Sequence, residues 1–225
     1  NELKKTGLAA DTIVAEGHTK NAESNGRHQL NEEQEAAVRT ITNRSDEFNV
    51  HLLHGITGSG KTEVYLNCID DVLNRGKQAL VLVPEIGLTP QMQARFEDRF
   101  GNQIACIHSG LGEATRDRLW SDARSDRIKV VVGTRSSVFA NFQNLGLIVV
   151  DEEHDPAFKQ QDHPRYSARD IAVKRAQLTN IPLILGSATP SLETLNNARA
   201  GRYSLHSLRA RATGATLPST QIVDI

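Results

Sequence analysis

Two groups of side chains in this sequence have the types and the spacing needed for phosphate chemistry. The first is Gly55-Ile-Thr-Gly-Ser-Gly-Lys61-Thr62, a short glycine-rich loop that ends in a lysine and a threonine. Glycines let such a loop wrap so that its N–H groups point at phosphate oxygens. The pattern predicts that Lys61 meets the β- and γ-phosphates of a nucleotide and that the Thr62 hydroxyl binds Mg²⁺. An ordinary glycine-rich turn is the alternative.

The nucleotide is expected to be held by this loop and its flanks. A helix that begins near Lys61 adds the positive end of its dipole to the same place. The expected nucleotide-binding residues are Gly55, Thr57, Gly58, Ser59, Gly60, Lys61, Thr62 and Glu63.

The second group is Asp151-Glu152-Glu153-His154, which follows the apolar run 147–150. A carboxylate at the end of a buried strand suits Mg²⁺, which keeps several of its waters, so Asp151 is expected to bind the ion through a water. Glu152 is placed to orient and deprotonate an attacking water. Lys61, Asp151 and Glu152 are therefore the candidate catalytic residues. The alternative is an acidic run that only faces solvent.

Three further residues are candidates for coupling nucleotide state to motion. His154 lies next to the two carboxylates, and Ser187 and Thr189 form a Ser-Ala-Thr turn after a later apolar run. The two hydroxyls are expected to bridge to the carboxylate loop by hydrogen bonds. Alone, the Ser-Ala-Thr turn is equally typical of a turn followed by a helix N-cap.

The segments around these groups must place them at one edge of a fold. Near-continuous apolar runs, typical of strands buried on both faces, occur at 50–53, 79–83, 104–107, 128–133, 147–150 and 183–186. Helix-like segments alternate with them at about 61–74, 88–100, 113–124, 167–178 and 191–200. This alternation predicts an α/β fold with a mostly parallel central sheet and helices on both faces. Ligands bind beyond the carboxyl ends of such strands, where both groups lie.

A further helix is expected to begin after Asn31, which suits an N-cap, with Gln34 completing a capping box three residues later. The tail 204–225 has a weaker pattern, and 221–225 fits either a last strand or an exit linker.

The composition limits the class of protein. The chain has 225 residues, of which 38% are hydrophobic and 24% charged, as expected for a soluble, cytoplasmic globular protein. No apolar stretch approaches the roughly 20 residues of a membrane helix, so no membrane partner is expected. Cys68 and Cys106 suit buried thiols. Because the net charge is −1, any nucleic-acid contact is expected to come from a local patch, from backbone amides or from parts outside this chain. The chain begins at Asn1, and we expect it to be a piece of a longer protein.

Longer stretches of the sequence resemble a known family. Residues 29–200 are similar to the first RecA-like lobe of the superfamily 2 helicases, and within them to the primosomal replication-restart helicases. The matching stretches are 55–65, 82–90, 108–110, 133–139, 151–154 and 186–191.

This resemblance implies a three-layer RecA-like P-loop NTPase lobe at 29–203. Residues 1–28 would be a linker or the tail of a winged-helix domain, and 204–225 an exit segment towards a second lobe that supplies an arginine finger. The implied function is the ATP-binding lobe of an ATP-dependent 3′-to-5′ DNA helicase in replication restart. The implied cofactors are ATP and Mg²⁺, with no zinc here. The implied partners are single-stranded and forked DNA, and primosome or single-strand-binding proteins through the parent protein.

The resemblance also implies roles for further residues. Gln34 is similar to the glutamine that contacts adenine, although a plain helix N-terminus is the alternative. Two loops are similar to those that touch the DNA backbone, and backbone amides, hydroxyls and a guanidinium are the groups that phosphates need. The candidate residues in these loops are Pro84, Glu85, Gly87, Thr134, Arg135 and Ser136.

The segment after the carboxylates resembles the aromatic-rich, DNA-sensing loop of this family and of the RecQ helicases. In it, Phe158 or Tyr166 would stack on a base, and Lys159 and Arg165 would hold phosphates. An irregular surface loop with one buried phenylalanine is the alternative.

Two other functions remain open at this point. The isolated lobe would bind nucleotide and DNA without turnover, or the chain would belong to another superfamily 2 translocase, RecG-like or of the restriction-enzyme type. The long matches at 84–90 and 133–139 argue against the second.

Overall fold

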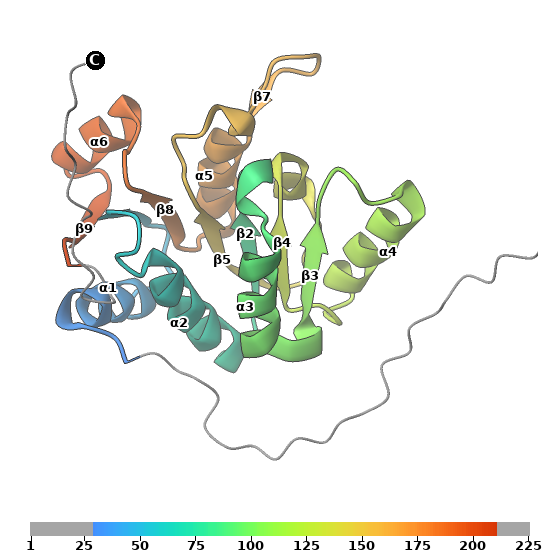
Figure 1. Cartoon of the computed structure of the whole chain (residues 1–225), viewed down its shortest axis with the longest axis horizontal. Helices are drawn as coiled ribbons and strands as arrows, with labels where there is room; N and C mark the ends of the chain where they lie inside the picture. The colour runs from blue at the N-terminus through green and yellow to red at the C-terminus, as the bar shows by residue number, and fades with distance from the viewer. Residues whose placement is uncertain (1–28, 211–225) are drawn as a thin grey trace, which may run out of the picture.

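The computed structural model describes residues 29–210, which form one sheet with helices on both sides (Figure 1). The predicted segment 1–28 and most of the predicted exit segment, including the candidate strand at 221–225, lie outside the described residues. Seven strands pair in the order β3-β4-β2-β5-β8-β1-β9, and every neighbouring pair is parallel. The predicted parallel α/β architecture is confirmed.

The elements follow the predicted alternation closely. The strands of the sheet are β1 (Val50–Gly55), β2 (Gln78–Leu82), β3 (Ile104–Ile107), β4 (Val130–Gly133), β5 (Leu145–Val150), β8 (Leu183–Ser187) and β9 (Ser204–Leu208). The helices are α1 (Glu32–Thr42), α2 (Lys61–Asn74), α3 (Pro90–Phe100), α4 (Glu113–Arg124), α5 (Ala168–Thr179) and α6 (Leu192–Arg199). Short 3₁₀ turns occur at Glu85–Gly87, Gly101–Gln103, Arg135–Phe139 and Pro156–Phe158.

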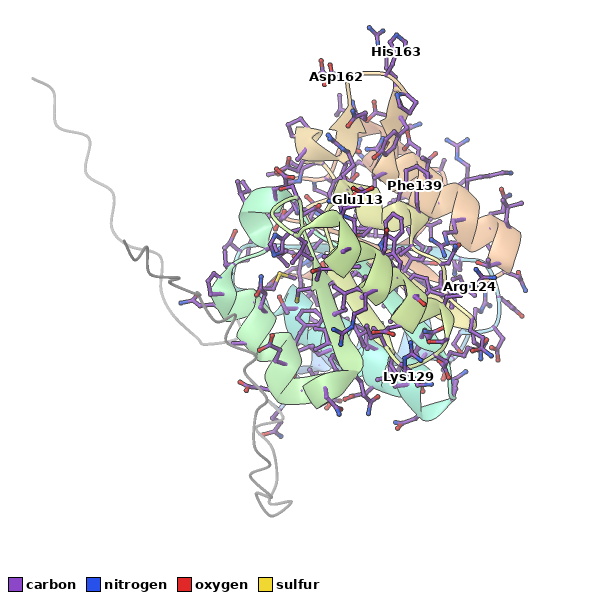
Figure 2. All side chains as sticks on the ribbon, turned by 90° about the vertical axis from the view of Figure 1, so that its right-hand side faces the viewer. Glu113, Arg124, Lys129, Phe139, Asp162 and His163 are labelled. Carbon is purple, nitrogen blue, oxygen red and sulfur yellow. The ribbon has the colours of Figure 1, made fainter. Side chains whose placement is uncertain are left out.

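A small hairpin stands apart from the sheet. Its strands β6 (Lys159–Gln160) and β7 (Tyr166–Ser167) pair antiparallel. Figure 2 shows its tip, where Asp162 and His163 point away from the body of the molecule. The expectations for this segment were an aromatic-rich, DNA-sensing loop or an irregular surface loop, and neither included a hairpin.

Local chemistry explains where the helices begin. The Asn31 side chain accepts a hydrogen bond from the Gln34 backbone N–H, and the Gln34 side chain accepts one from Asn31, so the predicted capping box is present. Thr89 caps α3, with Pro90 at the first helical position. Ser167 and Ser191 cap α5 and α6 in the same way.

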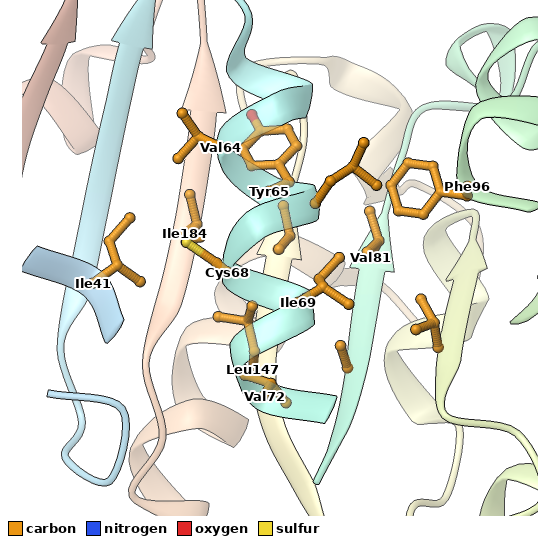
Figure 3. Packing of buried hydrophobic residues seen from close by; sticks show 14 of the residues in the cluster. Ile41, Val64, Tyr65, Cys68, Ile69, Val72, Val81, Phe96, Leu147 and Ile184 are labelled. Carbon is orange, nitrogen blue, oxygen red and sulfur yellow. The ribbon is translucent and has the colours of Figure 1, made fainter. Parts of the chain in front are cut away.

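Alternate residues of the strands face two separate cores. Val81, Val149 and Ile184 belong to a cluster with residues of α1, α2 and α3. Their neighbours Leu80 and Ile148 belong to a second cluster with α4 and α5. Helices therefore cover both faces, which is why the strands are continuously apolar. Figure 3 shows the first cluster, with the buried side chains of α2 lying between the strands and Phe96 of α3.

The strand β9 extends the sheet beyond residue 203, where the sequence placed the end of the lobe. It pairs with β1, and the ring nitrogens His51 Nδ1 and His206 Nε2 lie 3.0 Å apart across the pair. Burial lowers the pKa of His51 to about 3, so this histidine is neutral near pH 7. After β9, the backbone N–H groups of Arg209 and Ala210 donate to the Glu33 carboxylate of α1 at 2.7 and 3.3 Å. Where the lobe itself ends stays a prediction.

Candidate nucleotide site and the neighbouring loops

The candidate residues lie at the carboxyl edge of the sheet in two adjacent groups. The loops after β5, β8 and β1 carry the predicted phosphate, carboxylate and coupling residues, and these strands are neighbours in the sheet. The loops after β4 and β2 carry six of the predicted DNA residues, and these strands lie together on the other side of β5. The other four lie between β5 and α5. The strand β5, which leads into Asp151, therefore separates the two groups.

The glycine-rich loop folds into a cradle between β1 and α2. Gly58 and Gly60 have φ of 81° and 84°, a left-handed conformation that side chains with a Cβ rarely adopt. Lys61 is 8% exposed, and its Nζ donates to the Gly55 carbonyl at 2.9 Å. The same Nζ lies 3.7 Å from Glu152 Oε1. The phosphate loop and the carboxylate loop are thus in direct contact.

Other loop residues differ in how they are presented. Thr57 and Gly58 are exposed, and Thr62 is partly exposed at the first turn of α2. Ser59 is buried, and its Oγ is without a hydrogen-bond partner among the described residues. A Cβ at Gly55 would lie 2.4 Å from that Oγ, so only glycine fits where the chain leaves β1.

Gln34 bonds to the phosphate loop. Its Nε2 donates to the Ser59 carbonyl at 2.8 Å, while its Oε1 accepts the Asn31 N–H. The side chain is 3% exposed. One amide hydrogen remains for a ligand, so contact with adenine stays a prediction.

Glu63 points to a different neighbour than expected. Its carboxylate is 3.1 Å from Arg95 Nη2 and 3.8 Å from Arg99 Nη1, both on α3. The predicted nucleotide contact of Glu63 is therefore left to its backbone, because the side chain ties α2 to α3.

Asp151 is held at the end of β5 by two donors to one oxygen. Its Oδ1 accepts from the Tyr65 hydroxyl at 2.9 Å and from the Glu152 N–H at 3.1 Å. Burial, followed by the nearby negative charge of Glu152, raises the pKa of Asp151 above its usual value. A cation bound here would offset that repulsion.

Glu152 lies between a lysine and a histidine. Its Oε1 is 3.7 Å from Lys61 Nζ, and its Oε2 is 3.7 Å from His154 Nδ1. Its φ of 47° is left-handed, an uncommon conformation for a residue with a Cβ. The backbone therefore turns this carboxylate towards the phosphate loop at a local cost in strain.

The three predicted coupling residues meet in one cluster. The Ser187 hydroxyl and His154 Nδ1 are 2.8 Å apart, and the Thr189 hydroxyl and His154 Nε2 are 3.2 Å apart. The Ser187 hydroxyl also accepts from the Thr189 N–H at 2.9 Å. The expected bridge between the two loops is present, while its role in coupling stays a prediction.

Glu153, for which the sequence indicated no role, is buried and is the centre of a hydrogen-bond network. Its Oε1 accepts the Ser191 N–H at 2.7 Å, and its Oε2 accepts the Thr194 hydroxyl at 2.9 Å. Arg169 Nη1 of α5 lies 3.1 Å from the same Oε2. The carboxylate loop is thereby fixed to α5 and α6. Its place in an acidic run hid this role, although a Ser–x–x–Thr helix start offers the donors that a buried carboxylate needs.

The predicted DNA residues differ from one another in their exposure to solvent. Pro84 and Thr134 are buried, whereas Glu85 and Ser136 are exposed. Arg135 Nη1 donates to the carbonyls of Ala157 and Lys159 at 3.2 and 3.3 Å, so it binds the segment after the carboxylate loop. A cavity of about 190 Å³ lies between these loops, lined by Val83, Pro84, Glu85, Arg135, Ala157 and Phe158.

The expectation that Phe158 could stack on a base is wrong. It is 2% exposed and packs in the α5 core, so it is not presented to a base. Tyr166 is half-buried, and its ring meets that of Phe139 edge-on at 5.1 Å. Lys159 and Arg165 are exposed, as phosphate contact requires. Only the tyrosine is therefore available as the predicted aromatic platform.

Comparison with known proteins agrees with this geometry. A family model described as DEAD/DEAH box helicase matches residues 31–198. The chain belongs to the DEAD/DEAH box helicase family. A helicase domain of this family implies nucleotide binding. Among the described residues, no helix is long and apolar enough to cross a membrane.

Two curated relatives are replication restart proteins. The chain is 50% identical over 198 residues to the replication restart protein PriA of Bacillus subtilis, covering 87% of the chain and 25% of that protein. It is 49% identical over 205 residues to PriA of Haemophilus influenzae, covering 91% and 28%. The chain thus spans about a quarter of the length of these curated relatives.

Solved structures show the same fold at lower identity. RecG bound to a three-way DNA junction matches with a TM-score of 0.56 at 24% identity, over 80% of this chain and 24% of that one. The Hef helicase domain of Pyrococcus furiosus matches with a TM-score of 0.53 at 18% identity, over 76% and 37%. The fold of this chain is thus shared with these two proteins.

Proposed function

We propose that this chain is the ATP-binding lobe of an ATP-dependent 3′-to-5′ DNA helicase that acts in replication restart. The observation that carries the proposal is the 3.7 Å approach of Lys61 Nζ to Glu152, which joins the phosphate loop to the carboxylates. The identity to PriA proteins supports the replication-restart role.

The proposed site holds ATP over the glycine-rich loop. Backbone N–H groups of 57–62 and the Lys61 ammonium bind the phosphates, and Gln34 contacts the adenine. The Thr62 hydroxyl and the Asp151 carboxylate are hard oxygen donors of the kind that Mg²⁺ prefers. When bound, Mg²⁺ neutralises charge that develops on the phosphate oxygens.

Glu152 is the proposed base for the attacking water. Lys61 Nζ and His154 Nδ1 each lie 3.7 Å from one of its two oxygens. A γ-phosphate attracts Lys61 more strongly than one carboxylate does, because its charge is larger. Lys61 then turns to the phosphate, and the freed Glu152 oxygen orients a water. His154 passes the change to Ser187 and Thr189.

DNA is proposed to bind along the loops after β2 and β4 and at the hairpin. Arg135, Ser136, Lys159 and Arg165 are the groups offered to phosphates, and Tyr166 is offered to a base. The parent protein is proposed to act in the cytoplasm on single-stranded and forked DNA, with primosome or single-strand-binding proteins as partners. A second lobe supplies the arginine finger, which contributes roughly 10³–10⁵ in rate.

The test compares this chain with the full-length protein. The chain alone is expected to bind Mg²⁺–ADP weakly in calorimetry and to show no DNA-stimulated ATPase. The full-length protein is expected to bind Mg²⁺–ADP and to show DNA-stimulated ATPase. Lys61→Ala in the chain should remove the ADP binding, and Lys174→Ala on the exposed face of α5 serves as the control. Strong DNA-stimulated turnover by the chain alone would refute the assignment of the finger to another lobe.

A further inference from the structure

Tyr65 is a buried residue of α2 with a polar tip that faces the candidate site. It lies one helical turn after Lys61, and its side chain is fully buried. Figure 3 shows its ring among the apolar side chains of α2 and its hydroxyl at the end of this cluster. The hydroxyl donates to Asp151 Oδ1 at 2.9 Å. A phenylalanine would fill the same core, so packing alone does not explain the hydroxyl.

The hydroxyl determines which oxygen of Asp151 is free. Both donors to this carboxylate, the Tyr65 hydroxyl and the Glu152 N–H, bind Oδ1. Oδ2 accepts no hydrogen bond from the described residues. It is not one of the buried atoms without a partner, so it is reached by solvent. The terminal torsion of an aspartate is broad. Two donors on one oxygen therefore fix the rotation and leave Oδ2 open to a ligand.

The neighbouring strand is shaped to admit this hydroxyl. A Cβ at Gly186 in β8 would lie 1.6 Å from Tyr65 Oη and 3.3 Å from Asp151 Oδ1. Any larger residue would displace the tyrosine tip from the carboxylate. Gly186 directly precedes Ser187, which contacts His154. The phosphate-loop helix, the carboxylate loop and the Ser-Ala-Thr turn thus meet at one hydroxyl.

We propose that Tyr65 is a positioning residue for the magnesium–nucleotide site, holding Asp151 so that Oδ2 faces the metal's water. This rests on the proposed function, which gives Asp151 the metal. Tyr65 and Lys61 belong to the same helix, so a movement of α2 shifts both the lysine and the aspartate. The groups that would hold the phosphates and the metal are thereby linked through one helix.

The experiment measures ADP affinity with and without Mg²⁺ in the full-length protein, using a fluorescent ADP analogue. Tyr65→Phe should leave the affinity in EDTA unchanged and reduce the gain in affinity due to Mg²⁺ about tenfold, because loss of a group that orients a metal ligand typically costs 10–100-fold. The control is Ile69→Val, a buried change one turn further along α2, which should keep the full gain.

A second variant, Gly186→Ala, helps to distinguish loss of the hydroxyl contact from a general folding defect. Gly186→Ala should displace the hydroxyl and reduce the same Mg²⁺-dependent gain. In the Tyr65→Phe background its further effect on the gain should be smaller than in the parent, because the hydroxyl is already missing. Thermal melts establish that each variant is folded.

The outcomes distinguish the positioning role of Tyr65 from the proposed function on which it rests. If Tyr65→Phe keeps the full gain, or lowers affinity equally with and without Mg²⁺, the positioning role is overturned while the proposed function stands. If Asp151→Asn also keeps the full gain, the metal role of Asp151 in the proposed function fails, and the role of Tyr65 fails with it.

Discussion

The two halves of the carboxyl edge are built differently. In the half formed by the loops after β5, β8 and β1, side chains bond one loop to the next, as in the pairs Lys61–Glu152 and His154–Ser187. In the half formed after β2 and β4, Arg135 is the one residue in the described part of the chain that reaches the hairpin segment with hydrogen bonds. That half exposes Ile86 at 84% and Phe139 at 50%, and the first half exposes Ile56 at 45%.

This difference suits two kinds of ligand. A small, highly charged ligand is bound best by groups that are already oriented, because little reorganisation is then needed. A long flexible ligand is bound by exposed groups along a surface, with each contact contributing little. The comparison therefore supports nucleotide on one side of β5 and nucleic acid on the other, and the following changes test it.

Lys61→Ala should have the largest effect, because it removes the one cation of the phosphate cradle. In the full-length protein we expect ATPase and unwinding to fall about 10³-fold, the upper end for loss of one pre-oriented donor. DNA binding in a filter assay should stay within a factor of two or so. Unwinding that survives would remove Lys61 from the site, and an equal loss of DNA binding would mean that the halves are not separate.

Phe158→Ala tests the boundary between the halves. Because the ring is buried, its truncation should lower the free energy of unfolding by about 3–4 kcal/mol. Tyr166→Ala is the matched change, and it should cost less stability while weakening the stimulation of ATPase by DNA. Urea unfolding and stimulated ATPase together make the distinction. A stable Phe158→Ala protein that has lost only DNA stimulation would restore the base-stacking role.

Glu153→Ala should loosen the attachment of the carboxylate loop. It leaves Arg169 and the Ser191 N–H without their buried partner, which should cost about 3 kcal/mol of unfolding free energy. The control is Glu193→Ala on α6, an exposed position where a change within about 0.5 kcal/mol is expected. Equal midpoints in urea for the two variants would contradict the role of Glu153 in this network.

Arg135→Gln should have the smallest effect, and only in the DNA half. If Arg135 binds one phosphate, the slope of log affinity against log salt should become shallower by about one. The loss should be uniform across DNA sequences, and ADP affinity should be unchanged. Arg124→Gln on α4 is the control. An unchanged slope would leave Arg135 as a purely internal link to Ala157 and Lys159.

The positions of the glycine-rich loop and of Asp151 in the fold could be predicted because the patterns that indicate them are local. The glycine-rich pattern indicates a phosphate-binding loop by itself. Asp151 follows an apolar run that is long enough to indicate a strand. Capping at Asn31 and Gln34 is local in the same way. The strand order is not local, yet alternation of strands and helices was enough to predict a parallel sheet.

The parts that could not be predicted depend on contacts between distant segments. Glu153 and Glu152 are adjacent and chemically alike, and only the fold turns one into the core and the other to Lys61. The Tyr65–Asp151 bond joins residues 86 positions apart. Phe158 could not be placed because aromatic residues serve cores and stacking surfaces equally well. The strand β9 was missed because 204–208 alternates with serine and histidine rather than running apolar.

The anchoring of Arg209 and Ala210 on Glu33 has a mechanical consequence. Glu33 directly precedes Gln34, whose amide holds the phosphate-loop carbonyl of Ser59. Tension applied to the backbone after residue 210 would act on this first turn of α1 before it strained the β1–β9 ladder. The backbone at 209–210 is therefore tied through Glu33 and Gln34 to the phosphate loop, so a pull on it would reach that loop before the sheet.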